Sequence, residues 1–302
     1  MLARVVSADA WRWQPHPEVW FLIAALTGLY VYAARAIGPK AVPAGRPVLT
    51  RANKAAFAGG MLLLWFASDW PVHDIAEEYL YFVHMSQHLI FTLVMAPLLL
   101  LATPRWLADL VLGDGRVRRV IRWCAKPVVA GIVFNAVTIF THWPAVVNQS
   151  VESGALHYSV HVLVVFTALM MWMPVCGPIM EWRISLPAQM VYLFLMSVIP
   201  TVPGAWLTFA TNPLYKAYDT SFRLSGVSVE DDQQAAGLIM KLGGGSWLWV
   251  IITAKFFVWA NRHEEAERAG RRVDERDVLT WAKVEQELAR TEPAADPHHT
   301  KP

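Results

Sequence analysis

Long apolar segments alternate with short polar segments along most of this chain. Seven of the apolar segments are long enough, or nearly long enough, to cross a bilayer as helices. They cover residues of about 19–37, 53–68, 81–102, 127–142, 156–175, 188–210 and 236–260. The composition agrees, because only 17% of the 302 residues are charged, whereas soluble proteins carry about 25%. The pattern predicts an all-α, polytopic membrane helix bundle with about seven transmembrane helices, in contact with lipid and not with nucleic acid.

The distribution of Lys and Arg predicts the orientation of these helices. Positive residues gather after the first, third and fifth segments and in the C-terminal tail, whereas residues 69–80 and 143–155 contain none. Because cytoplasmic loops are enriched in Lys and Arg, we expect the N-terminus outside and the C-terminus in the cytoplasm. The predicted organisation is an extracytoplasmic segment (1–18), a membrane domain (19–260) and a charged cytoplasmic tail (261–302). We expect that tail to be helical over about 263–290 and disordered beyond, and we expect no cleavable signal peptide.

Two histidine pairs with the same spacing stand out in the apolar segments. They are His84 with His88 in HMSQH, and His157 with His161 in HYSVH. Residues four apart share one face of a helix, and the predicted topology places both pairs at the outer ends of two parallel helices. Imidazole is a common metal ligand and is costly to leave unpartnered in lipid. The pairs predict a four-nitrogen metal site, with hydrogen bonding across helices as the alternative.

Four further residues are candidates for the same site. His73 and His142 fall on the predicted outer side, where each is either a ligand or a solvated loop residue. The thioether of Met85 favours Cu(I), but on a helix Met85 is rotated by about 100° from its neighbour His84. Asp232 precedes the seventh segment and either orients an imidazole or caps a helix.

The remaining polar groups limit the chemistry of the site. Cys124 and Cys176 fall on the predicted cytoplasmic side, so a mixed cysteine and histidine site is not expected. The positive ends of the helices that carry the histidines disfavour a bound cation. Carboxylates near the starts of these helices offset that effect, and they are Asp69, Asp74, Glu77, Glu78 and Glu152.

Several blocks of sequence, in order, resemble a known family. They are SDWPVHDIAEEYLYFVHMSQHLIFTLVMAPLLLLATP (68–104), THWP (141–144), HYSVH with a following apolar run that ends in WMPVCGP (157–178), and DDQQAAGLIM (231–240). At these positions the chain resembles the CtaG-type cytochrome c oxidase assembly factors. It departs from their pattern at Lys241-Leu242, where the family often has an aromatic residue and a proline.

The resemblance implies a function as well as a fold. It implies a non-enzymatic, multi-pass protein of the bacterial plasma membrane that binds copper and delivers it to the catalytic subunit of a heme–copper oxidase at the extracytoplasmic face. The implied ligands are His84, His88, His157 and His161, with Asp232 as the matching acidic residue.

Other interpretations of the histidines stay open at the level of sequence. One is a b-type cytochrome in which two helices hold heme, and another is a metal-free assembly chaperone. A membrane di-iron hydroxylase is disfavoured, because such enzymes usually carry more histidines in tight clusters, generally on the cytoplasmic side. Zinc is an alternative to copper, and the sequence also leaves a homo-oligomer open.

Overall fold

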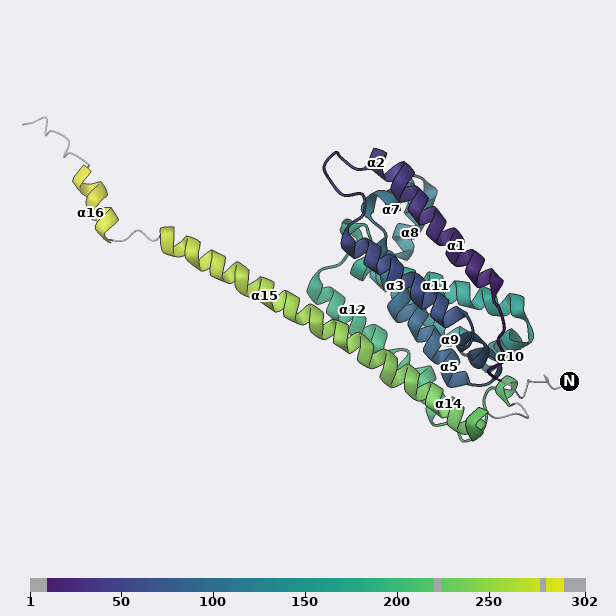
Figure 1. The fold of residues 1–302 in the computed structure, drawn as a ribbon. Coiled ribbons are helices and arrows are strands. Elements are labelled where there is room, and N and C mark those ends of the chain that lie inside the picture. Colours follow the sequence, from purple (N-terminus) through teal and green to yellow (C-terminus); the bar gives the residue numbers. More distant parts are fainter. Residues whose placement is uncertain (1–9, 220–223, 278–280, 291–302) are drawn as a thin grey trace, which may run out of the picture. The chain divides into compact units, whose positions relative to one another are not determined.

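The computed structural model describes residues 10–219, 224–277 and 281–290. Over these residues the chain forms helices and no strand, as Figure 1 shows, so the predicted all-α class is confirmed. The chain divides into two units, Met1–Lys255 and Phe256–Pro302.

The helices follow the apolar segments closely. In chain order they are α1 (Pro17–Tyr32), α2 (Gly38–Ala41), α3 (Arg51–Ser68), α4 (Val72–Glu78), α5 (Tyr81–Leu89), α6 (Ala96–Ala102), α7 (Arg105–Leu112), α8 (Arg116–Cys124), α9 (Pro127–Thr141), α10 (Pro144–Glu152), α11 (Gly154–Cys176), α12 (Leu186–Val198), α13 (Thr201–Thr208), α14 (Val229–Leu238), α15 (Gly245–Asp277) and α16 (Trp281–Arg290). Wider π-helical turns at Ala33–Ile37, Ile90–Met95 and Ile239–Gly244 join α1 to α2, α5 to α6 and α14 to α15.

Five helical runs are long and apolar enough to cross a membrane. They are Pro17–Ala41, Tyr81–Ala102, Gly154–Cys176, Leu186–Thr208 and Val229–Ala269. Two bent pairs pass the same test only as pairs, namely α3 with α4, bent by 44°, and α8 with α9, bent by 75°. By length and composition the described residues therefore hold five spans, or up to seven if each bent pair is one span.

The helix run Tyr81–Ala102 and α11 pack side by side in the same direction. His84 and His157 meet near their first turns, with ring centroids 5.6 Å apart. Further along, the indole N–H of Trp172 donates to the carbonyl oxygen of Thr92 at 2.8 Å. Two parallel helices in this register bring both histidine pairs to the same depth, as the sequence predicts.

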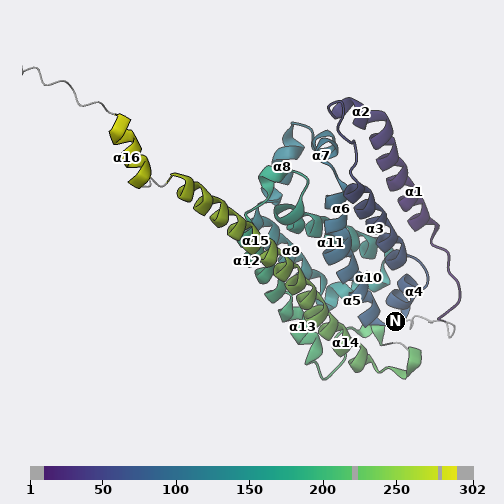
Figure 2. The same cartoon turned by 60° about the vertical axis from the view of Figure 1, so that its left-hand side comes forward.

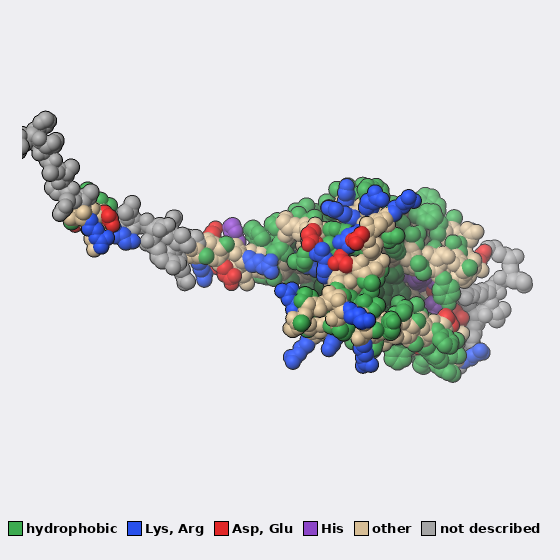
Figure 3. Space-filling model, turned by 90° about the horizontal axis from the view of Figure 1, so that it is seen from above, with side chains coloured by type: hydrophobic (Ala, Val, Ile, Leu, Met, Phe, Trp, Pro, Cys, Tyr) green, Lys and Arg blue, Asp and Glu red, His purple; other side chains and the backbone are tan. Residues whose placement is uncertain are grey.

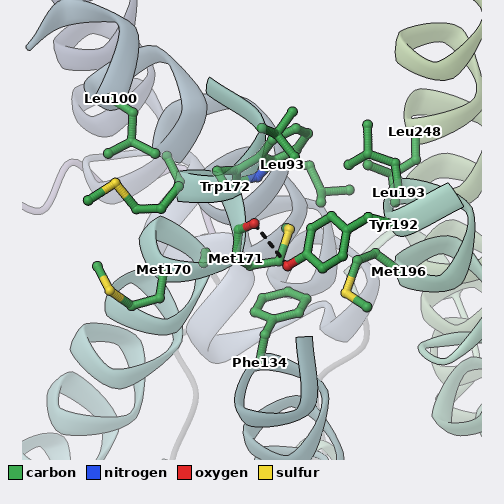
Figure 4. Packing of buried hydrophobic residues seen from close by; sticks show 14 of the residues in the cluster. Leu93, Leu100, Phe134, Met170, Met171, Trp172, Tyr192, Leu193, Met196 and Leu248 are labelled. Carbon is green, nitrogen blue, oxygen red and sulfur yellow. Dashed lines mark hydrogen bonds between the residues drawn. The ribbon is translucent and has the colours of Figure 1, made fainter. Parts of the chain in front are cut away.

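The main apolar core lies beyond the histidines, toward the C-terminal end of α11. Figure 4 shows Trp172 and Met171 of α11 among side chains of the neighbouring helices, with the Tyr192 hydroxyl donating to the carbonyl oxygen of Met171 at 3.0 Å. Met170 and Met173 are buried in the same core, whereas Met180 is exposed. These methionines of α11 therefore pack in the core.

Positive side chains gather at one end of the first unit. Figure 3 looks onto the end that carries α2, α7 and α8, where Lys and Arg side chains line the face. Helix α8 buries no side chain, and its Arg116, Arg119 and Arg122 are exposed. Figure 2 shows α1 along one edge of this unit and α12 and α13 toward the opposite edge. The histidine pairs are about a full helix length from the basic end, because α11 starts near His157 and ends at Cys176.

The second unit contains the C-terminal part of α15 and helix α16. Its described contacts are local: the ring of Trp259 stacks on His263, with centroids 5.6 Å apart, and Arg268 pairs with Glu264 at 3.1 Å. The two helices cover much of the tail for which the charges predict a helix. Residues 291–302, predicted to be disordered, lie outside the described residues.

Candidate metal centre

Three helices bring four potential metal ligands together. Glu77 lies one residue before the end of α4, His84 lies in the first turn of α5, and His157 and His161 lie in the first two turns of α11. One ligand atom from each of the four side chains lies within 4.8 Å of the others. The group combines three of the four predicted imidazoles with a carboxylate.

The distances within this Glu77–His84–His157–His161 cluster are short. Glu77 Oε1 lies 2.6 Å from Nε2 of His157 and 3.6 Å from Nδ1 of His84. The ring centroids of His157 and His161 are 4.4 Å apart, and those of His84 and His161 are 5.5 Å apart. The four side chains therefore converge on one point rather than forming two separate pairs.

Each member of the cluster has a buried polar atom that makes no hydrogen bond with the described residues. These atoms are Glu77 Oε1, His84 Nδ1, His157 Nε2 and His161 Nε2. The contact of 2.6 Å between Glu77 and His157 is close, but it does not have the angles of a hydrogen bond. A buried polar atom without a partner costs about 1–3 kcal/mol, and a cation bound at the centre would satisfy all four. The residues present thus fit a metal ion.

The electrostatics of the cluster also suit a cation. The N-terminal ends of α5 and α11 point partial positive charge at the cluster and oppose a bound cation. The Glu77 carboxylate counters that charge at the point where the ligand atoms meet. Three imidazoles and one carboxylate form a ligand set that zinc, copper and iron all accept.

His88, the fourth predicted imidazole, lies beside the cluster. Its Nε2 lies 3.0 Å from Nε2 of His84, and its ring centroid lies 4.7 Å from that of His161. Because one of two neutral imidazole nitrogens must donate in such a contact, His88 can fix the proton position of His84. Its predicted role as a direct ligand stays a prediction.

Asp232 caps the helix that carries two of the predicted ligands. Its side chain is 1% exposed, and its two carboxylate oxygens accept the backbone N–H groups of Tyr81 and Phe82 at 2.8 and 2.9 Å. These are the first two residues of α5, so Asp232 fixes where α5 begins. Its own helix, α14, is capped by Ser228. Asp232 is thus a helix cap, one of its two predicted roles, but the helix that it caps is α5 and not its own helix, α14.

His73 and His142 lie on opposite sides of the cluster. His73 is in α4, with its Nδ1 3.3 Å from the side-chain amide of Gln87, and its ring meets that of His16 edge-on at 4.9 Å. His142 follows α9, where its Nδ1 lies 2.6 Å from the carbonyl oxygen of Thr138 and its Nε2 lies 3.3 Å from Sδ of Met85. Neither belongs to the four-residue group.

Cavities border the cluster on both sides. A small one of about 20 Å³ is lined by His84, His88, His157 and His161 together with Met85 and His142. That volume holds about one water-sized particle. A larger, lateral pocket of about 720 Å³ has the polar side chains of Glu18, Ser68, His73, Gln87, His157 and His161 in its wall. The rest of the wall is mainly apolar and comes from α1, α3, α11 and the helix run Tyr81–Ala102. His157 and His161 therefore separate the enclosed cavity from the lateral pocket.

Glu77 is the member of the cluster that the histidine spacing does not reveal. In the sequence it is one of several acidic residues before the third apolar segment, with nothing to distinguish it from its neighbour Glu78. The signal for it is weak: its position in a short helix that directly precedes α5 and returns to the same end of the bundle. Cys124 and Cys176 stay outside the cluster, since Cys176 lies about 29 Å from His157 along the axis of α11.

The fold and the cluster define a membrane helix bundle with a buried histidine and carboxylate centre near one end. A sequence model of the cytochrome c oxidase caa3 assembly factors (Caa3_CtaG) matches residues 28–262, which include every member of the cluster. The chain belongs to this family, as the resemblance predicts. No curated protein and no solved structure matched the chain in the same comparisons.

Proposed function

We propose that this chain is a non-enzymatic assembly factor that binds copper at the Glu77–His84–His157–His161 cluster and delivers it to the catalytic subunit of a heme–copper oxidase. The observation that carries the proposal is the convergence, within 4.8 Å, of ligand atoms from four side chains that each have a buried polar atom with no hydrogen bond. The family supplies the connection to oxidase assembly.

Copper is the metal that the ligands and the family favour together. Imidazole binds copper, zinc, iron and nickel, and among divalent ions Cu²⁺ binds a given nitrogen and oxygen site most tightly. Zinc would accept the same four ligands. Assembly of a heme–copper oxidase requires copper, so copper is the cargo that connects the cluster with the family.

The proposal places the chain in the bacterial plasma membrane, with seven spans and the cluster near the extracytoplasmic face. The basic end formed by α2, α7 and α8 then lies in the cytoplasm, in agreement with the positive-inside rule. In this proposal the two bent helix pairs are the second and fourth of the seven spans in chain order. Cargo would enter and leave on the outer side, where the copper centre of the client subunit is assembled.

The lateral pocket gives the cluster a route to a partner inside the bilayer. His157 and His161 line both the enclosed cavity and this pocket. Because both rings already border the pocket, a bound ion can leave toward it and need not cross the buried side. A client subunit that packs against α1 and α11 would meet the cargo there.

The alternatives make different demands on the site. The cavity that His84, His157 and His161 share is about 20 Å³ and suits a single ion. A heme would instead have to occupy the lateral pocket of about 720 Å³, which His73, His157 and His161 line, and an optical spectrum would detect it. A metal-free chaperone would gain nothing from four buried polar atoms that make no hydrogen bond with the described residues. The cost falls most clearly on His161 Nε2, whereas the other three atoms lie in the charge contacts of Glu77.

Metal analysis of the purified full-length protein tests the proposal. Wild type reconstituted with copper and then desalted should retain about one ion per chain at the cluster. The double variant His157→Ala, His161→Ala should lose that ion, and the exposed tail variant His263→Ala should keep it. Equal copper in wild type and the double variant would overturn the proposal, and an optical heme spectrum in the wild type would favour the cytochrome.

A further inference from the structure

Met85 and His142 form a contact that the proposed copper centre does not use. The imidazole Nε2 of His142 lies 3.3 Å from the thioether Sδ of Met85. Both residues are buried, His142 with 7% and Met85 with 2% of its surface exposed. They come from α5 and from the residue directly after α9, so the contact joins two helices beside the small cavity.

The hydrogen bond on the other side of the ring fixes the tautomer of His142. Its Nδ1 lies 2.6 Å from the carbonyl oxygen of Thr138. A carbonyl oxygen can only accept, so Nδ1 carries the proton and donates it. In the neutral imidazole Nε2 then presents a lone pair, and it points at a sulfur that also offers a lone pair.

The lone pairs of His142 Nε2 and Met85 Sδ face each other at 3.3 Å in a buried place. An electron-pair acceptor between the two atoms would stabilise this arrangement. A protonated imidazole could fill the role, but a buried charge with no acidic partner is costly. A metal ion is the other candidate. Bonds from zinc to nitrogen and to sulfur, taken as typical, are about 2.0 and 2.3 Å long. Because their sum exceeds the 3.3 Å between the two atoms, one ion can bond to both.

We propose that Met85 and His142 form a second, soft metal site that is selective for Cu(I). Thioether and imidazole ligands without a carboxylate favour Cu(I) over Zn²⁺, in contrast to the cluster that contains Glu77. The inference deepens the proposed function, on which it rests for the identity of the cargo. It gives the chain two adjacent positions for copper with different ligand chemistry.

The geometry of α5 explains why the two sites are neighbours and yet distinct. Met85 follows His84 by one residue and therefore points away from the cluster by about 100°. His88 lies between these two directions, since it is three residues after Met85 and four after His84. Its Nε2 is 3.0 Å from Nε2 of His84, and its ring centroid is 6.5 Å from that of His142. His88 is thus placed to contact an ion in either position.

The far side of the soft site supports the same chemistry. A cavity of about 70 Å³ adjoins Met85, His88 and His142, and its walls include Met171, Met196 and Met240. These three thioethers line the adjoining cavity without adding charge, which suits a monovalent soft ion more than a divalent one.

X-ray absorption spectroscopy of the full-length protein loaded with Cu(I) under a reductant tests the proposal. The wild type should show a sulfur scatterer at bonding distance, and the protein loaded with Zn²⁺ should show only nitrogen and oxygen. Met85→Leu should remove the sulfur scatterer and weaken Cu(I) binding at least tenfold in a chelator competition. Met170→Leu, a buried methionine of α11 that lines none of the cavities at the cluster, should change neither.

The outcomes separate this inference from the proposed function. Two results would overturn the soft site and leave the proposed copper centre intact. One is bound copper that depends on His157 and His161 but shows no sulfur scatterer. The other is a sulfur scatterer that is still present in Met85→Leu. A sulfur scatterer that depends on Met85 while the His157→Ala, His161→Ala variant keeps all its copper supports the soft site and overturns the cluster. Leucine is close to methionine in volume, so Met85→Leu should fold, and His142→Gln provides a second variant.

Discussion

The carboxylate of Glu77 lies 2.6 Å from Nε2 of His157, although the two residues belong to helices far apart in the chain. The contact joins the end of α4 to the beginning of α11 and lacks the angles of a hydrogen bond. An acid and an imidazole held this close without a hydrogen bond are arranged as two ligands of one ion would be.

Replacement of Glu77 by Gln should weaken metal binding more than it affects folding. The substitution keeps the size of the side chain but removes the negative charge that offsets the positive ends of α5 and α11. We expect the affinity for Cu²⁺ to fall at least tenfold in a competition with a chelator of known strength. Glu78→Gln is the matched control, since this neighbouring carboxylate is not in the cluster. Equal losses in the two variants would show that Glu77 acts only through general charge.

Replacement of His161 by Leu should stabilise the metal-free protein. The Nε2 atom of His161 is buried and makes no hydrogen bond with the described residues. Leu removes that polar atom, which should raise stability by about 1 kcal/mol. Copper at a hundred times its dissociation constant should add about 2.7 kcal/mol to the wild type and much less to the variant. Thermal unfolding in detergent, with and without copper, measures both effects. A variant that is less stable without metal would show that His161 is satisfied by other means.

Much of this arrangement follows from sequence because it depends on spacing along single helices. The i, i+4 repeat places His84 with His88 and His157 with His161 on shared helix faces, and the alternation of Lys and Arg predicts that the two helices run in the same direction. The rotation of one residue along α5 likewise predicts that Met85 turns away from His84. These are local properties of a helix, and they survive folding unchanged.

The rest depends on how separate segments pack. Whether Glu77 of α4 lies close to the histidines depends on the path of the chain between α3 and α5. The spacing of apolar and polar residues does not predict that path. Asp232 contacts Tyr81 across about 150 residues of sequence, so its role as a cap for α5 is invisible in the neighbourhood of either residue. That His88 lies beside the four-residue cluster and not within it likewise appears only in the packed structure.

The docking of the residues before α1 should weaken as the pH rises. Outside the membrane-spanning segments, Nε2 of His16 lies 3.2 Å from Asp74 and Nδ1 lies 3.2 Å from Glu18. Burial lowers the pKa of His16, but the two carboxylates outweigh burial and hold the pKa above the ordinary value of 6.5. The protonated imidazole therefore stabilises the folded state fully below pH 6.5, and this contribution disappears as the pH rises through the raised folded pKa.

A comparison of wild type with His16→Gln between pH 5.5 and 9 measures this contribution. The wild type should have the higher Tm at the acidic end, and the difference should shrink toward the alkaline end. His263→Gln should show no such trend, because His263 is exposed and its contact with Glu267 lies on the surface of α15. A difference that grows with pH would mean that His16 acts as a neutral hydrogen-bonding group.

Substitution of Asp232 by Asn should disturb the metal centre from a distance. Both carboxylate oxygens of Asp232 accept backbone N–H groups at the start of α5, and Asn can offer only one acceptor there. We expect a loss of about 2 kcal/mol in unfolding free energy, together with a smaller loss of copper affinity because the first turn of α5 carries His84. Asp231→Asn is the control, since Asp231 is exposed and interacts with Ser228 within its own helix end. If Asp232→Asn abolished copper binding without a change in stability, Asp232 would act on the ion directly and not through the position of α5.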